Sequence, residues 1–148
     1  MDILWVAMGG AMGASSRFLI GSLLARWTGT ALPWPTLAIN VSGCLALGLL
    51  DAWLTTRPTG TGGGLRSFLG AGFLGGFTTF SAFGLETTRL LQRQAMTEAI
   101  AYVVLSVMVG LAAVPVGQAL GRRLSGTLPP FGSASTPSVT PQAEHPPQ

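Results

Sequence analysis

The stretch "GFLGGFTTFSAF", residues 72–83, decides the fold because it interrupts a hydrophobic segment near its centre. It contains three glycines, two adjacent threonines and four phenylalanines. Glycine destabilises a helix interior by about 0.5–1 kcal/mol relative to alanine, and an adjacent glycine pair favours a kink. The stretch therefore predicts a hydrophobic helix that is broken in the middle.

The composition around this stretch is that of a membrane protein. The 148 residues are 48% hydrophobic and only 9% charged, with a mean hydropathy of +0.52, whereas soluble domains contain about 25% charged residues. A helix needs about 20 apolar residues to cross a bilayer, and four stretches are long enough, near 3–26, 35–56, 65–88 and 99–121. We expect an all-α membrane protein with four transmembrane helices, the third broken at mid-membrane.

The two ends of the chain differ in character. A signal peptide begins with basic residues, but the only early charge is Asp2, so we expect the first span to be retained. Residues 125–148 hold six of the ten prolines and no apolar pattern, which predicts a disordered Pro/Ser-rich tail. The transmembrane domain is therefore expected at 1–124. Cys44 is the only cysteine, so the chain has no intrachain disulfide.

The arginines outside the span centres are almost evenly divided between the two sides of the membrane. With four spans, the side that holds the termini has Arg57, Arg66, Arg122 and Arg123, and the other side has Arg26, Arg89 and Arg93. Orientation follows the Lys/Arg difference, so four against three allows either one weakly biased orientation or dual topology. We expect dual topology, with two oppositely inserted copies forming an antiparallel homodimer. Positions at helix ends favour the lipid bilayer, not nucleic acid, as the partner of these charges.

Polar residues recur on one face of three of the helices. The first helix spaces Gly9, Gly13 and Arg17 at i+4, and Gly-x-x-x-Gly is a close-packing motif. Arg17 either snorkels to the membrane surface or lines a wet vestibule that attracts anions. Asn40 in the second helix, and Tyr102 with Ser106 in the fourth, serve either as interhelical hydrogen bonds or as donors that line a pore.

The broken third helix offers both backbone and side-chain groups. Lipid cannot satisfy the freed backbone groups, so such a break must lie inside protein or beside water and ions. The carbonyls around Gly75 to Thr78 are candidate ligands for a small hard cation. Phe80 and Phe83 follow at an i+3 interval; such a stripe either packs in a core or offers electropositive ring edges to an anion. Two hydroxyls lie beside this stripe, those of Thr79 and Ser81, and we expect both to line the pore.

Three motifs in register carry a family resemblance. "GGAMGASSRF" (9–18), "PTLAINVSG" (35–43) and "GFLGGFTTFSAF" (72–83), followed by Glu86, closely resemble the Fluc/CrcB family of fluoride ion channels. The resemblance covers all four expected spans and excludes the tail. It implies a dual-topology homodimer with two pores along the subunit interface. It also implies one structural Na⁺ at the dimer centre, held by backbone carbonyls of Gly75 and Thr78 from both copies.

The resemblance assigns further residues by their place in the motifs. The pore residues that it implies are Asn40, Phe80, Phe83, Tyr102 and Ser106. The first-motif arginine is Arg17 and the third-helix glutamate is Glu86. Two positions depart from the common family pattern: Ala82 stands where many members have threonine, and Gly110 where many have a second serine. These departures bear on conduction rate and selectivity.

The function expected from these observations is a fluoride-specific channel of the bacterial cell membrane. Such a channel lowers cytoplasmic fluoride by passive efflux. No nucleophile–base pair or His/Cys cluster suggests an enzyme. Two alternatives stay open: a small dual-topology multidrug exporter, which needs a buried carboxylate as a proton relay, and a non-transporting membrane scaffold.

Overall fold

The computed structural model describes residues 2–29, 31–55 and 63–124. Within them lie four helical segments long and apolar enough to cross a membrane, at Asp2–Ala25, Trp34–Thr55, Gly63–Gln92 and Met96–Leu124. The prediction of an all-helical chain with four spanning helices is confirmed. The third and fourth segments exceed the predicted 65–88 and 99–121, because hydropathy marks the apolar centre while the helical backbone continues through charged residues at the ends. Arg57 and the tail 125–148 lie outside the described residues.

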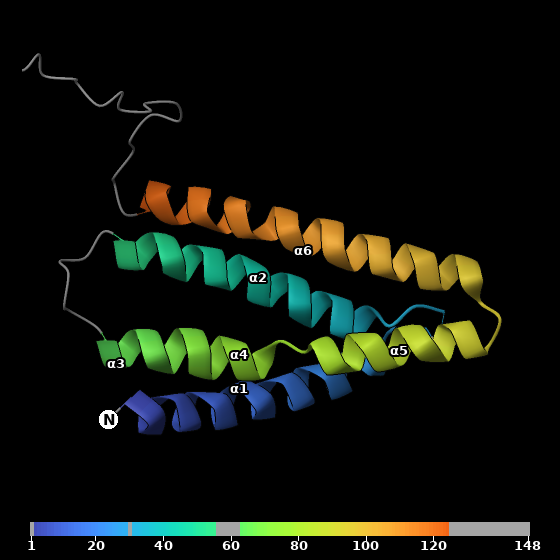
Figure 1. Cartoon of the computed structure of the whole chain (residues 1–148), viewed down its shortest axis with the longest axis horizontal. Helices are drawn as coiled ribbons and strands as arrows, with labels where there is room; N and C mark the ends of the chain where they lie inside the picture. Colours follow the sequence, from blue (N-terminus) through green and yellow to red (C-terminus); the bar gives the residue numbers. More distant parts are fainter. Residues whose placement is uncertain (1, 30, 56–62, 125–148) are drawn as a thin grey trace, which may run out of the picture.

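The third span is divided into several helical elements. In chain order the elements are α1 (Asp2–Ala25), α2 (Trp34–Thr55), α3 (Gly63–Arg66), the π-helix η1 (Ser67–Leu74), α4 (Gly75–Phe77), α5 (Phe80–Gln92) and α6 (Met96–Leu124). Figure 1 shows α3, α4 and α5 following one another along one line, with a short non-helical link between α4 and α5. That link is Thr78 and Thr79, both in extended backbone conformations.

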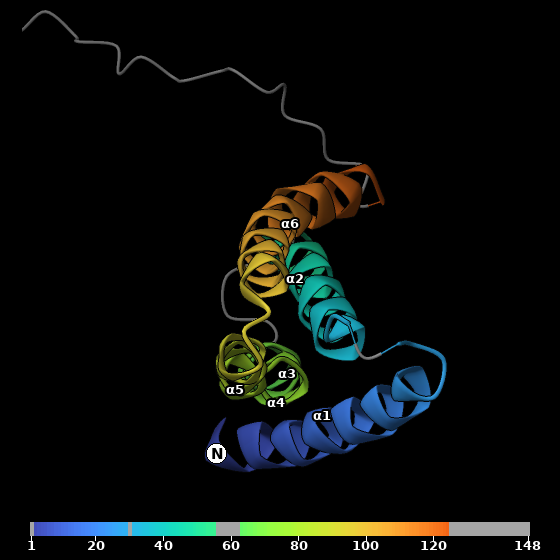
Figure 2. The ribbon, with the colours of Figure 1, turned by 90° about the vertical axis from the view of Figure 1, so that its right-hand side faces the viewer.

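The spans pack mainly in two pairs. The α2 helix lies against α6, and α1 lies against η1 and α4; the end view in Figure 2 shows α2 next to α6, and α1 crossing beside the third span. Glycines allow both contacts. A Cβ at Gly9 or Gly13 would collide with backbone carbonyls of η1, and one at Gly48 or Gly117 would collide with carbonyls across the α2–α6 contact. The helix backbones therefore touch directly, as small-residue motifs favour.

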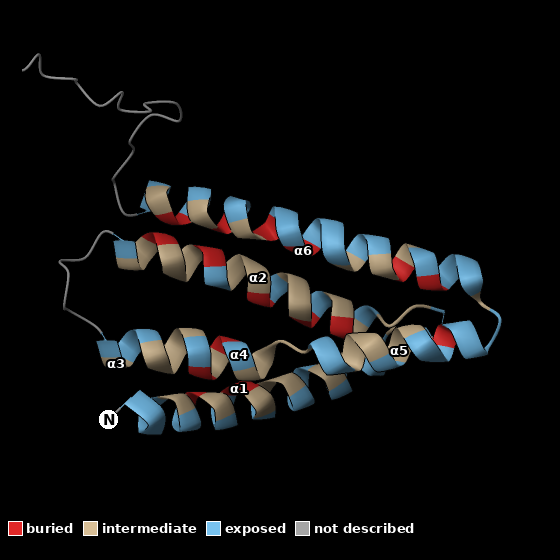
Figure 3. Ribbon diagram, viewed as in Figure 1, coloured by how far each residue is buried: buried red, intermediate tan, exposed pale blue. Residues whose placement is uncertain are grey.

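Few side chains are buried within one chain. Figure 3 shows buried residues as narrow stripes between the helices and exposed residues over the outer faces. A small apolar cluster of Leu90, Ala99 and Tyr102 joins α5 to α6. Large apolar side chains such as Phe18, Phe80 and Leu111 are exposed. In water such an apolar surface would mark an interface; in a membrane protein, lipid or another copy covers it.

Candidate functional site

The interruption of the third span is organised by Thr79. This residue is the N-cap of α5, and its side-chain oxygen accepts the backbone N–H of Ala82 at 3.2 Å. Threonine is a favoured N-cap because it satisfies one of the unpaired N–H groups in the first helical turn. The same hydroxyl lies 3.2 Å from Oγ of Ser81. A new helix therefore begins at Phe80 with its first turn already capped.

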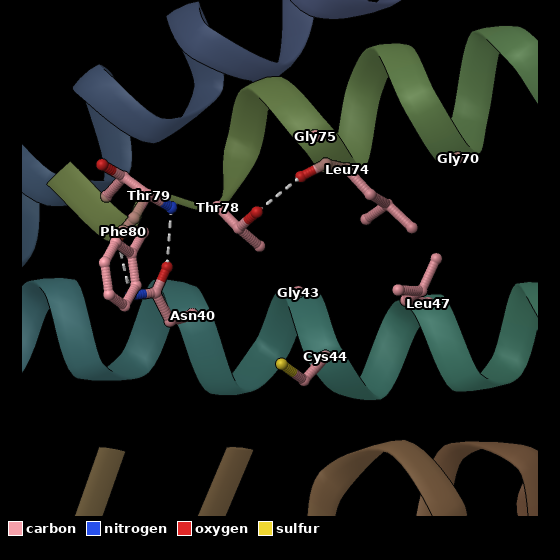
Figure 4. A pocket seen from close by; sticks show the side chains of 10 residues that line it. All are labelled: Asn40, Gly43, Cys44, Leu47, Gly70, Leu74, Gly75, Thr78, Thr79 and Phe80. Carbon is pink, nitrogen blue, oxygen red and sulfur yellow. Dashed lines mark hydrogen bonds between the residues drawn. The ribbon is translucent and has the colours of Figure 1, made fainter. Parts of the chain in front are cut away.

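Asn40 of α2 binds the backbone of Thr79 through both ends of its amide. The Thr79 N–H donates to Oδ1 of Asn40 at 2.8 Å, and Nδ2 of Asn40 donates to the Thr79 carbonyl at 3.0 Å; Figure 4 shows this pair beside the ring of Phe80. The amide nitrogen carries two hydrogens, and the described residues provide a partner for only one of them. Asn40 thus supports the break and retains one N–H.

The break removes the helical donors of several carbonyls, among them those of Gly75 and Thr78. In a continuous α-helix the carbonyl of Gly75 accepts from the N–H of Thr79, and that of Thr78 from the N–H of Ala82. Here the Thr79 N–H donates to Asn40 and the Ala82 N–H donates to the Thr79 side chain. The two carbonyls predicted to bind Na⁺ are thus among those that lose their usual partners, and hard oxygen ligands of this kind fit such a cation.

Arg17 of α1 also contacts the break. Its Nε donates to the carbonyl of Gly76 at 3.2 Å, a group whose helical donor in an unbroken helix would be the N–H of Phe80. The half-buried guanidinium has further donors, and it lines a cavity of about 470 Å³ together with Thr79, Ala82 and other residues of α1, α2 and α5. The structure adds this bond to Gly76, and both snorkelling and the wet vestibule stay predictions for Arg17.

Glu86 links three helices through its carboxylate. Oε1 accepts from the Thr36 hydroxyl of α2 at 2.8 Å, and Oε2 accepts from the Tyr102 hydroxyl of α6 at 2.7 Å. Tyr102 is only 1% exposed. Its hydroxyl is therefore engaged with Glu86, which distinguishes it from Ser106, whose buried Oγ has no partner within the part of the chain that is described.

The aromatic residues form a connected row. The Phe80 and Phe83 rings lie 5.5 Å apart, and the Phe83 and Tyr102 rings 5.3 Å apart, each pair tilted by 46°. Phe80 is 82% exposed. It borders a pocket of about 330 Å³ on the α2 side of the break, together with Asn40 and Thr79 (Figure 4).

The structure brings most of the predicted site residues to the break or next to it. Asn40, Thr78, Thr79, Phe80 and Arg17 contact it or border it directly. Ser106 lies on α6, and within the described part of the chain its buried Oγ has no hydrogen-bond partner. Sequence reasoning missed two local roles: the N-cap at Thr79, signalled by a threonine just before a helical run, and the bond from Thr36 to Glu86, for which the sequence holds no signal.

Comparison with known proteins agrees with the motif resemblance. Residues 4–118 match the family model described as "CrcB-like protein, Camphor Resistance (CrcB)". A relative from Paracoccus denitrificans is 47% identical over 121 residues, covering 82% of this chain and 94% of its own length. One from Chloroflexus aurantiacus is 46% identical over 125 residues, covering 84% and 98%. A Caulobacter relative is 41% identical over 122 residues, covering 82% and 95%.

All three relatives carry the same name, "Fluoride-specific ion channel FluC". The family match spans all four helical segments, including α1, the break and most of α6. The resemblance drawn from the three motifs is therefore confirmed. This chain belongs to the CrcB-like protein family.

Proposed function

We propose that this chain is a fluoride-specific ion channel that lowers cytoplasmic fluoride by passive efflux of the anion. The shared name of its relatives supports this activity. The observation within the chain that carries the proposal is the break at Thr79, where Asn40 and the exposed ring of Phe80 meet. The protein is a multi-pass bacterial membrane protein, and its family has the activity of a channel and not of an enzyme.

The functional unit in this proposal is an antiparallel homodimer of dual topology, with the break at mid-membrane. One chain alone leaves the site unfinished: Phe80 is 82% exposed and the Ser106 hydroxyl has no partner among the described residues. A second copy placed against the exposed face of Phe80 would bury this ring. Two copies related by a two-fold axis in the membrane plane would form two equivalent pores.

Na⁺ is proposed at the dimer centre as a structural ion. The carbonyls of Gly75 and Thr78 would hold it, because both have lost their helical N–H donors. Backbone carbonyls are the kind of hard oxygen ligand found in cation sites of membrane proteins. The ion would supply positive charge that compensates the freed carbonyls of both copies and would join the two breaks.

Neutral donors suit the passage of a small anion. A channel must replace part of the hydration shell of fluoride while binding it weakly enough for release. The remaining N–H of Asn40, the Ser106 hydroxyl and the positive edges of the Phe80 and Phe83 rings meet this requirement. Tyr102 would act indirectly in this proposal, because its hydroxyl is engaged with Glu86 while its ring supports Phe83.

The two alternatives are less well supported. An exporter of cationic drugs needs a membrane carboxylate that can exchange protons and substrate. The carboxylate of Glu86 accepts two hydrogen bonds from hydroxyls, and that of Asp51 accepts one from Nε2 of Gln118 at 2.9 Å. Both carboxylates are therefore already engaged with protein groups. A scaffold needs close helix packing, which the glycines provide, but it does not need the Asn40-supported break.

Ion flux from liposomes separates these functions. Purified protein in liposomes loaded with potassium fluoride or potassium chloride is given a potassium ionophore, and each anion is followed with its electrode. Rapid fluoride efflux with chloride efflux at the level of protein-free liposomes is expected. Fluoride efflux no faster than in protein-free liposomes would overturn the proposal, and proton-coupled uptake of an organic cation would favour the exporter.

A further inference from the structure

A second charged region lies at the end of α5, away from the break. Here a cavity of about 450 Å³ opens between the α1–α2 connection and α5, and its charged lining residues are Glu86, Arg89 and Arg93. Glu86 and Arg89 lie one turn apart on one face of α5, and Arg93 is the C-cap residue that follows the helix. The sequence places Arg89 and Arg93 just beyond the predicted span 65–88, and the structure adds that both border this cavity.

Arg89 and Arg93 lack an acidic partner within residues 2–29, 31–55 and 63–124. No ion pair of Arg89 or Arg93 is found among the described residues. The nearest acid along the helix is Glu86, but its two oxygens accept the hydroxyls of Thr36 and Tyr102. Like charges at i and i+4 destabilise a helix slightly. Both arginine side chains are exposed, so water solvates them, and two like charges that face one cavity raise the local concentration of small anions there.

The cavity continues toward the break. It shares Ala25, Pro35 and Glu86 with the neighbouring cavity, which contains Arg17, Thr79 and Ala82. Arg89 and Arg93 thus lie at the outer part of this route and Arg17 at the inner part, where it binds the carbonyl of Gly76. Together the two cavities contain three guanidinium groups and one carboxylate, a formal charge of +2.

We infer that Arg89 and Arg93 form an electrostatic antechamber that concentrates small inorganic anions and delivers them toward the break through the cavity of Arg17. The inference rests on the proposed channel function and adds two residues that set the rate of anion entry. A charged lining in a concave site raises the local concentration of the opposite ion, and salt screens this effect. The two arginines need not touch the permeating ion in its narrowest passage.

The phosphate of a lipid headgroup is the other source of negative charge at a helix end. The two sources differ in what they require. An anion antechamber acts in membranes that contain no anionic lipid, and its effect disappears at high ionic strength. A headgroup site changes with the anionic lipid content of the bilayer and acts through the stability of the protein.

The test is fluoride flux of the double variant R89Q/R93Q in liposomes of zwitterionic phosphatidylcholine. Glutamine removes the charge and keeps part of the length and part of the hydrogen-bonding capacity of the arginine side chain. The matched control is R122Q/R123Q, which removes two adjacent charges at the end of α6, outside both cavities. Flux is measured at limiting fluoride, once at low salt and once with an impermeant salt added.

A reduction of about threefold to tenfold is expected for R89Q/R93Q at about 0.01 M ionic strength, where the Debye length is about 30 Å, and little change at about 1 M, where it is about 3 Å. The fluoride flux of R122Q/R123Q is expected to match that of the wild type at both ionic strengths. Equal flux of R89Q/R93Q and wild type at low salt would overturn the inference while leaving the channel function intact. A loss that persists at high salt, or that appears only with anionic lipid, would overturn it in favour of a structural or headgroup role. A wild type without fluoride flux would overturn both proposals.

Discussion

The bond between Asn40 and Thr79 yields the sharpest prediction. Asn40→Ala removes the acceptor of the Thr79 N–H and the donor to the Thr79 carbonyl, 2.8 and 3.0 Å away. A hydrogen bond between membrane helices contributes about 0.6–1.7 kcal/mol, so the loss of both lowers the stability of the local structure by about 1–3 kcal/mol. Because 1.4 kcal/mol is a factor of ten in an equilibrium, the opening equilibrium at Thr79 rises by roughly 5-fold to 150-fold.

Amide hydrogen exchange measures this opening at single residues. NMR of the protein in detergent micelles follows the Thr79 and Ala82 amides of the wild type and Asn40→Ala. Ser42→Ala is the matched control, because the Ser42 hydroxyl donates only to the Ile39 carbonyl of its own helix, at 3.0 Å. Exchange at Thr79 that is equal in all three proteins would refute the view that Asn40 supports the break.

Three further predictions test other positions of the structure. Gly13→Ala places a Cβ against a carbonyl of η1 and should lower the free energy of unfolding by about 1–3 kcal/mol. Its control is Gly10→Ala, which should leave this free energy nearly unchanged because the new Cβ has no neighbour closer than 3.9 Å. Equal effects of the two substitutions would contradict the close α1–η1 contact. Tyr102→Phe removes the 2.7 Å hydrogen bond to Glu86 and should lower the free energy of unfolding by about 1–3 kcal/mol. An unchanged midpoint of thermal unfolding would mean that this bond contributes nothing. Gly110→Ser adds a Cβ that lies 3.8 Å from the nearest side-chain atom, so it should fold normally and increase fluoride flux if a donor is missing there; normal folding with unchanged or lower flux would exclude that explanation.

The local features of the fold were predictable from the sequence. Four apolar stretches are sufficient to indicate four helices, because the length needed to cross a bilayer is set by the bilayer itself. The glycine pair next to Thr78 and Thr79 marked the place where the structure leaves the helical conformation. The π-helix at Ser67–Leu74 was not predicted, because a run of glycine, leucine and phenylalanine does not distinguish an i+4 from an i+5 hydrogen bond.

The partners of the polar side chains were not predictable in the same way. Asn40 and Thr79 are 39 residues apart, and Arg17 and Gly76 are 59 apart. Such pairs depend on the depth and rotation at which two helices pack, and periodicity determines neither. For the same reason Tyr102 and Ser106 looked equivalent on one face of α6, although the structure gives a partner to Tyr102 and none, within the described residues, to Ser106.

The most direct test of the central claim is fluoride efflux through Phe80→Ile. Phe80 borders the pocket at the break and is 82% exposed in one chain, so its replacement removes an aromatic edge without opening a packed core. Phe68→Ile is the control, since the Phe68 ring packs edge-on against Trp5, away from the break, with 6.3 Å between the ring centroids. The account predicts fast fluoride efflux without chloride efflux for the wild type and Phe68→Ile. It predicts that a folded Phe80→Ile variant loses the fluoride efflux. Undiminished fluoride efflux in Phe80→Ile would contradict an aromatic pathway at the break.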